Sequence, residues 1–150
     1  ALRPIYSVYD AVLYLDLKNN SFRSVYKTGK DRVVESDRLA EDLLSYVQKN
    51  VYSEDIARCT DFLDPDRMWE RLEKSEEGYL LSYFRAKGKR GKYVWKRFTL
   101  IRSCEEDKEQ RVIFGIHTLN MEKLAQIKEE TEVSLQEEEE GNSDEADFFK

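Results

Sequence analysis

Residues 79–119, YLLSYFRAKGKRGKYVWKRFTLIRSCEEDKEQRVIFGIHTL, decide the fold. They hold three long runs rich in Tyr, Phe, Val, Ile and Trp, at 79–86, 93–101 and 112–119, separated by short turn-like or charged segments. Runs of this composition are typical of strands, and short connections favour antiparallel pairing of neighbours. Both alternating faces of each run contain apolar side chains, which predicts a sheet that is covered on both sides.

The preceding sequence supplies elements that can pack against this sheet. Residues 11–17 and 21–27 are predicted to form a hairpin around an Asn-rich turn. The apolar periodicity that follows predicts short helices, the first of them running to about residue 50 with Asp37 as its N-cap. Asp64, which is followed by Pro, marks the start of another helix.

The chain is predicted to divide into three parts. Residues 1–10 form a short N-terminal helix, residues 11–119 the main domain, and residues 120–150 an exit helix that leads into an acidic, mobile tail or linker. The last part contains three Lys and eleven Asp or Glu, a net charge of −8, whereas the chain as a whole has −6. The body is therefore close to neutral, which argues against nucleic acid as a partner.

The remaining totals narrow the class of protein. At 150 residues with 40% hydrophobic side chains, the chain is long enough for one core. No apolar run approaches the length of a membrane span, so we expect a cytoplasmic protein without a membrane segment. Cys59 and Cys104 form no CxxC pair, and unpaired thiols are the expectation for such a domain.

Several short motifs follow one another in a recognisable order. Residues 51–55, VYSED, resemble a hydrophobic-x-Pro-Glu-Asp element, with Ser53 in place of the usual proline. Residues 82–85, SYFR, and 91–95, GKYVW, resemble a Tyr-Arg strand, an Asp-Gly turn and a Tyr-x-Trp strand, although an Arg stands where the turn usually has Asp. Residues 116–120, IHTLN, stand where an Ile-x-Asp-Ile-Thr-like signature would end the last strand, and they lack its acidic residue. Together with two early strands, short helices and three long strands, these motifs resemble a PAS domain.

The resemblance covers roughly residues 8–120 and implies a fold and a function. The implied fold is α+β and PAS-like, with a five-stranded antiparallel sheet and short helices over one face. The implied function is sensory or regulatory, without catalysis. The type of PAS domain that the chain most resembles is the module in front of GGDEF-type diguanylate cyclases and sensor histidine kinases of bacteria. The implied partner is therefore a C-terminal output domain.

No cofactor is expected from the residues that could hold one. His117 is the single histidine and has no companion ligand for haem or a metal ion. Cys59 lies in Ala-Arg-Cys-Thr-Asp rather than the Asn-Cys-Arg-Phe-like context of the flavin-binding PAS branch. Neither a haem nor a flavin signature is evident, and binding of an unidentified small molecule is left open.

Tyr83, Arg85 and Trp95 are the candidate ligand-binding residues. Adjacent strands can bring them to one face of the sheet, where an arginine between aromatic rings can hold an anionic ligand or a partner. The alternative is cross-strand packing, in which Arg85 simply stacks on Trp95.

Leu119, Met121 and Leu124 are the candidate relay and dimer residues. The prediction is that strain passes from the last strand into the helix that begins near Met121. A homodimer through the N-terminal helix, the outer sheet face and the exit helix would respond to that strain. Two alternatives remain: a ligand-free dimerisation and interaction module with a filled core, and a small α+β enzyme, for which His117 is the only available histidine.

Overall fold

The computed structural model contains two compact units, Ala1–Thr118 and Leu119–Lys150, which we describe separately. Most of the predicted N-terminal helix and the end of the acidic tail lie outside the described residues. No helix within the described part is both long enough and apolar enough to cross a membrane. The described residues are 9–27, 34–103, 109–120, 125 and 128–137.

The first unit is an α+β domain built on one antiparallel sheet with the strand order β3-β2-β1-β6-β5-β4. All five predicted strands are confirmed, each to within one residue at its ends. A sixth, β3, consists of two residues that pair with β2, and it was missed because two residues are too short to show alternation. The strands are β1 (Ala11–Asp16), β2 (Ser21–Lys27), β3 (Glu35–Ser36), β4 (Tyr79–Lys87), β5 (Tyr93–Arg102) and β6 (Arg111–Thr118).

Short helices connect the early and late strands, as predicted. Asp64 caps α4, since its Oδ1 accepts the backbone N–H of Asp66 at 3.0 Å. The prediction of Asp37 as the cap of α2 is wrong, because the helix starts two residues later and its first amides bond to the hairpin turn. Asn20 accepts there through its backbone oxygen and its side chain, at 2.9 Å each. The helices are α2 (Leu39–Asn50), α3 (Ile56–Phe62) and α4 (Pro65–Lys74), with the 3₁₀ turns η1 (Ser53–Asp55) and η2 (Lys89–Gly91).

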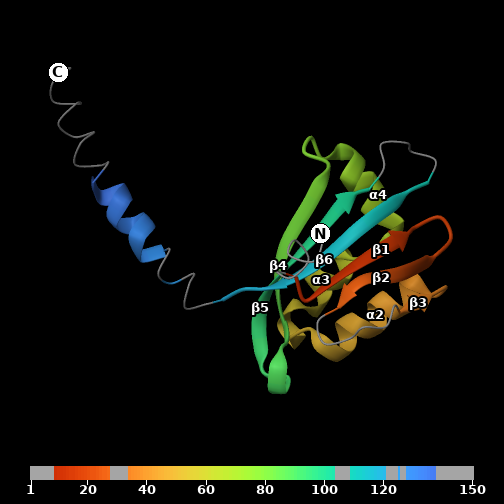
Figure 1. Ribbon diagram of the computed structural model, residues 1–150, viewed down its shortest axis with the longest axis horizontal. Helices are drawn as coiled ribbons and strands as arrows, with labels where there is room; N and C mark the ends of the chain where they lie inside the picture. The colour runs from red at the N-terminus through yellow and green to blue at the C-terminus, as the bar shows by residue number, and fades with distance from the viewer. Residues whose placement is uncertain (1–8, 28–33, 104–108, 121–124, 126–127, 138–150) are drawn as a thin grey trace. The chain divides into compact units, whose positions relative to one another are not determined.

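The helices α2, α3 and α4 lie together on one side of the sheet (Figure 1), and the core is the layer between them and the sheet. Phe84, Phe98 and Phe114 stand side by side on β4, β5 and β6 and are almost completely buried. The Phe98 ring centroid lies 5.1 Å from that of Phe84 and 5.4 Å from that of Phe114. Phe62 from α3 and Tyr46 from α2 extend this ladder, at 5.6 Å from Phe84 and 6.4 Å from Phe98. A row of contacting rings therefore runs through the middle of the interior, and we call it the ring ladder.

The opposite face of the sheet is covered unevenly. Over β6, the ring of Tyr9 takes the space beside Gly115, where a Cβ would lie 2.9 Å from the Tyr9 ring. Tyr79, Leu81 and Tyr83 on β4 remain exposed, as does Ile101 on β5. The Tyr9 ring thus covers part of β6, and the predicted cover of the face as a whole stays a prediction.

In the second unit, residue 125 and residues 128–137 are helical, in agreement with the predicted exit helix. Val133 and Leu135 of this helix are more than half exposed.

Candidate functional site

Arg85 on β4 forms a forked ion pair with Asp55 at the end of η1. Its Nε lies 3.0 Å from Oδ2 and its Nη2 lies 2.9 Å from Oδ1 of the carboxylate. The backbone N–H of Arg85 also donates to Oδ2, at 2.8 Å. Asp55 is buried, and Glu54 adds a longer contact to the guanidinium at 3.4 Å. The side-chain hydrogen bond from Arg85 holds the pKa of Asp55 below its usual range.

Aromatic rings flank the same guanidinium. The Arg85 Cζ lies 4.4 Å from the ring centroid of Tyr52 and 5.1 Å from that of Trp95. Trp95 is the cross-strand neighbour of Arg85, which explains the second contact. The structure therefore brings together two of the three candidate ligand-binding residues, Arg85 and Trp95. They are packed against each other across the strands, and the carboxylate of Asp55 is already paired with the arginine.

Tyr83 has a different environment from Arg85 and Trp95. Its cross-strand neighbour is Arg97, and its side chain is exposed. Its backbone oxygen accepts Nη2 of Arg58 at 2.7 Å, and Nη1 of Arg58 donates to Ser82 Oγ at 3.0 Å. Tyr83 is thus part of an exposed surface and not of the Arg85 cluster.

A second polar cluster joins the two ends of the first unit. Asp10, just before β1, accepts a hydrogen bond from the hydroxyl group of Thr118 at the end of β6. The backbone N–H of Asp10 donates to Ile116 O at 2.7 Å. Lys96 Nζ lies 3.5 Å from Oδ2 of Asp10, and its side chain is only 10% exposed. A carboxylate is therefore present where the chain leaves the last strand, although it comes from the other end of the domain.

This cluster was missed in the sequence, but one signal pointed to it. Lys96 alternates with the apolar Val94, Phe98 and Leu100 on the core side of β5, and an ammonium group that is buried there requires an anionic partner. Of the predicted relay residues, Leu119 directly follows Thr118 and is half-buried. The others, Met121 and Leu124, lie outside the described residues.

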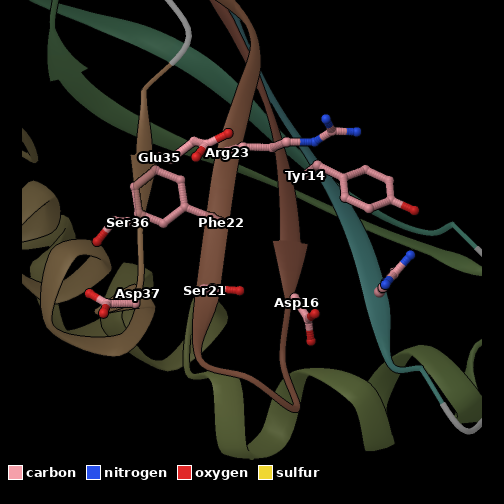
Figure 2. A pocket seen from close by; sticks show the side chains of 9 residues that line it. Tyr14, Asp16, Ser21, Phe22, Arg23, Glu35, Ser36 and Asp37 are labelled. Carbon is pink, nitrogen blue, oxygen red and sulfur yellow. The ribbon is translucent and has the colours of Figure 1, made fainter.

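A surface groove of about 670 Å³ lies over β1, β2 and β3 (Figure 2). Tyr14 and Arg23 line it, with the Arg23 Cζ 5.6 Å from the Tyr14 ring centroid. Because charges of both signs border the groove, it does not select one sign of ligand, and we assign it no role. Its charged residues are Asp16, Arg23, Glu35, Asp37 and Arg111.

Cys59 is a buried free thiol in α3. Burial raises its pKa to about 12, so the reactive thiolate is scarce at neutral pH. Within the ranges that the structure describes, no three His, Cys, Asp or Glu side chains gather into a group that could hold a metal ion.

Comparison with known proteins gave matches to solved structures alone. No protein-family model matches the chain, and no curated protein sequence matches it. A sensory box histidine kinase/response regulator from Burkholderia thailandensis is similar at 13% identity and a TM-score of 0.45, over 91% of this chain and 95% of that one. The N-terminal domain of a diguanylate cyclase with PAS/PAC sensor from Marinobacter aquaeolei is similar at 16% identity and a TM-score of 0.43, over 75% of this chain and 97% of that one.

The fold itself is defined by the chain's own elements. Two strands come first, short helices cross one face, and three long antiparallel strands complete the sheet. The Asp55–Arg85 pair joins the two motifs VYSED and SYFR, which carried the resemblance. This chain has a PAS-like α+β fold.

Proposed function

We propose that the chain is a sensory or regulatory module that responds to a protein partner and relays the response from Thr118 into the segment after it. The response does not involve catalysis. The observation that carries the proposal is the junction at Asp10, where one carboxylate connects the segment that leads into β1 with the end of β6. The proposed output is a C-terminal domain such as a diguanylate cyclase or a histidine kinase, in the cytoplasm of a bacterium.

The ring contacts in the middle of the interior favour a partner over a small molecule as the signal. In the ring ladder, Phe98 contacts Phe84 and Phe114 on either side, and all three are nearly inaccessible to solvent. Native cores are close-packed, and opening space for a ligand there would separate these rings. Arg85, the predicted anion-binding residue, already has the Asp55 carboxylate as its partner.

Coupling through the junction follows from the burial of Lys96. The ammonium group is largely removed from water, and Asp10 is the carboxylate beside it. Moving Asp10 away from β6 would leave that charge without its partner, which is costly in a protein interior. A displacement of Asp10, just before β1, would therefore break this ion pair. The displacement is resisted unless the end of β6 at Thr118 moves with it.

Native mass spectrometry of freshly purified protein tests the choice of signal. We expect the mass of the polypeptide alone. A small molecule retained in stoichiometric amount would overturn the partner-based proposal and favour a ligand sensor.

Amide hydrogen exchange tests the coupling. Substituting Asp10→Asn is expected to raise the exchange rate of the amides from Thr118 to Asn120 by about tenfold, because a loss of roughly 1.4 kcal/mol opens the segment ten times more often. Asp16→Asn is the matched control, since Asp16 bonds to Asn19 in the hairpin turn. Unchanged exchange in the Asp10 variant, or an equal rise in both variants, would refute the relay.

A homodimer is the remaining part of the prediction from sequence. Light scattering on the full chain over a range of concentrations tests it. A strict monomer at high concentration would exclude the dimer without affecting the junction.

A further inference from the structure

The three long strands have an unusual charge composition. Strands β4, β5 and β6 contain six Lys or Arg and no Asp or Glu. On the face away from the helices, they also expose a cluster of large apolar side chains, each between 38% and 44% accessible. We call this cluster the outer patch: Tyr79, Leu81, Tyr83 and Ile101.

Most of the strand cations obtain partners from other segments of the chain. Asp55 pairs with Arg85, Asp10 with Lys96 and Glu109 with Arg111, while Arg102 lies over the ring of Trp69.

Arg97 differs from these cations. Within the part of the chain that the structure describes, it makes no ion pair, and its Nε is a buried donor without a hydrogen-bond acceptor. Its cross-strand neighbours are Tyr83 on β4 and His117 on β6. Directly opposed residues share a face of a sheet, so the Arg97 guanidinium borders the outer patch. Arg97 is partly exposed although its Nε is buried, so a carboxylate from outside would pair with the charge of the guanidinium and not with Nε itself.

The edge of β4 limits how a partner can approach. Around Tyr83 and Arg85, the outward-facing backbone of this strand is already bonded, by Arg58 to Tyr83 O, by Asp55 to Arg85 N and by Tyr52 to Arg85 O. Addition of a partner strand along this edge would have to break these bonds. Strand addition is therefore disfavoured at this part of the edge, which favours a partner that lies across the face.

The same charges disfavour a second copy of this face as the occupant. In a symmetric face-to-face dimer, the same patch meets itself, so Arg97 would approach cations on strands that contain no carboxylate. Like charges without counter-ions oppose association. Charge complementarity instead requires an occupant that carries the missing acidic group.

We propose that the outer patch binds an acidic amphipathic helix of a partner protein. The apolar side of the helix covers Tyr79, Leu81, Tyr83 and Ile101, and a Glu or Asp within that side pairs with Arg97. This inference rests on the proposed function, because it names the chemistry of the partner that the module senses.

Fluorescence anisotropy with the full chain and a labelled model helix tests the inference. The probe has roughly 18 residues, or five turns, with Leu along one side and one Glu at the centre of that side. The matched peptide has Gln in place of the central Glu. We expect the Glu peptide to bind, the Gln peptide to bind about tenfold more weakly, and added salt to weaken the binding of the Glu peptide.

Two protein variants complete the test. Arg97→Gln should weaken binding of the Glu peptide about tenfold and should leave the Gln peptide unaffected. Arg23→Gln is the matched control, since Arg23 lies exposed on β2 and stacks on Tyr14. Because Arg97 has no ion-pair partner in the described chain to lose, its variant should keep the urea midpoint of the wild type, and this is measured first.

Four results would overturn the inference. The Glu peptide could fail to bind or bind no better than the Gln peptide, or Arg97→Gln could behave like Arg23→Gln. The chain could also form a dimer that Tyr83→Arg abolishes, which would show that a second copy covers the outer patch. If any of these occurs while the Asp10→Asn variant still raises exchange after Thr118, the acidic partner is wrong and the relay remains.

Discussion

Replacement of Asp55 is the sharpest test of how the fold is held together at the edge of the sheet. Asp55→Ala removes a buried carboxylate that accepts three hydrogen bonds from Arg85, one from its backbone and two from its guanidinium. Breaking one partner of a buried pair costs about 3–5 kcal/mol, and the partial exposure of Arg85 places this case near 3 kcal/mol. Asp55→Asn retains an acceptor without the charge, and since charge-assisted bonds are about twice as strong as neutral ones, about half of that loss is expected.

Urea unfolding followed by tryptophan fluorescence measures these losses. The m-value should stay constant, which makes the change in midpoint a change in stability. Asp61→Ala is the matched control, because Asp61 forms its ion pairs with Arg67 and Arg71 at the exposed surface, where such pairs contribute little. An Asp55→Ala loss no larger than that of the control would refute the bracing role of this pair.

The pH dependence gives an independent reading of the same pair. Because Arg85 lowers the pKa of Asp55 in the folded state, the ionised carboxylate stabilises the fold at pH values above the ordinary aspartate pKa of about 3.9. This contribution is lost as the pH falls through the lower pKa of the folded state. The stability difference between the wild type and Asp55→Asn should therefore be full at neutral pH and shrink in acid. A difference that does not depend on pH would contradict the assignment.

Three further substitutions test other parts of the domain. Phe98→Ala removes the middle of the ring ladder and should cost about 3–5 kcal/mol in urea unfolding, whereas Phe98→Leu should cost clearly less. Gly115→Ala places a methyl group 2.9 Å from the Tyr9 ring. It should displace that ring and lower the thermal midpoint, and adding Tyr9→Ala should recover part of the loss. Asn20→Ala removes the side-chain cap of α2 and should cost about 1 kcal/mol, measured by circular dichroism during urea unfolding.

The strands could be predicted from the sequence because their signal is local. Runs of β-branched and aromatic residues between turn signals defined five strands to within one residue, and Asp64 before Pro65 marked the start of a helix. The start of α2 was predicted wrongly because its cap, Asn20, lies in a distant hairpin turn. A cap supplied by tertiary contact leaves no trace in the residues next to the helix.

The candidate site was predictable in part for the same reason. Arg85 and Trp95 were expected on one face because strand alternation and hairpin register are short-range properties, and the structure pairs them. The partner of Arg85 was not predicted, although Asp55 stood in a motif of its own, because no local pattern joins a 3₁₀ turn to a strand 30 residues away. Asp10 was missed similarly, since its contact with Thr118 spans the whole domain.

These two contacts share a cause that also bears on the partner. The late strands contain no carboxylate, so every cation buried on them must take its counter-charge from another segment, and that segment is thereby held in place. Asp55 holds η1 against β4, and Asp10 holds the entry of the domain against its exit. Arg97 also needs a counter-charge, but no described segment of the chain supplies one. A carboxylate from outside the domain would complete the pattern, and it would hold a partner to the sheet as the internal carboxylates hold the chain.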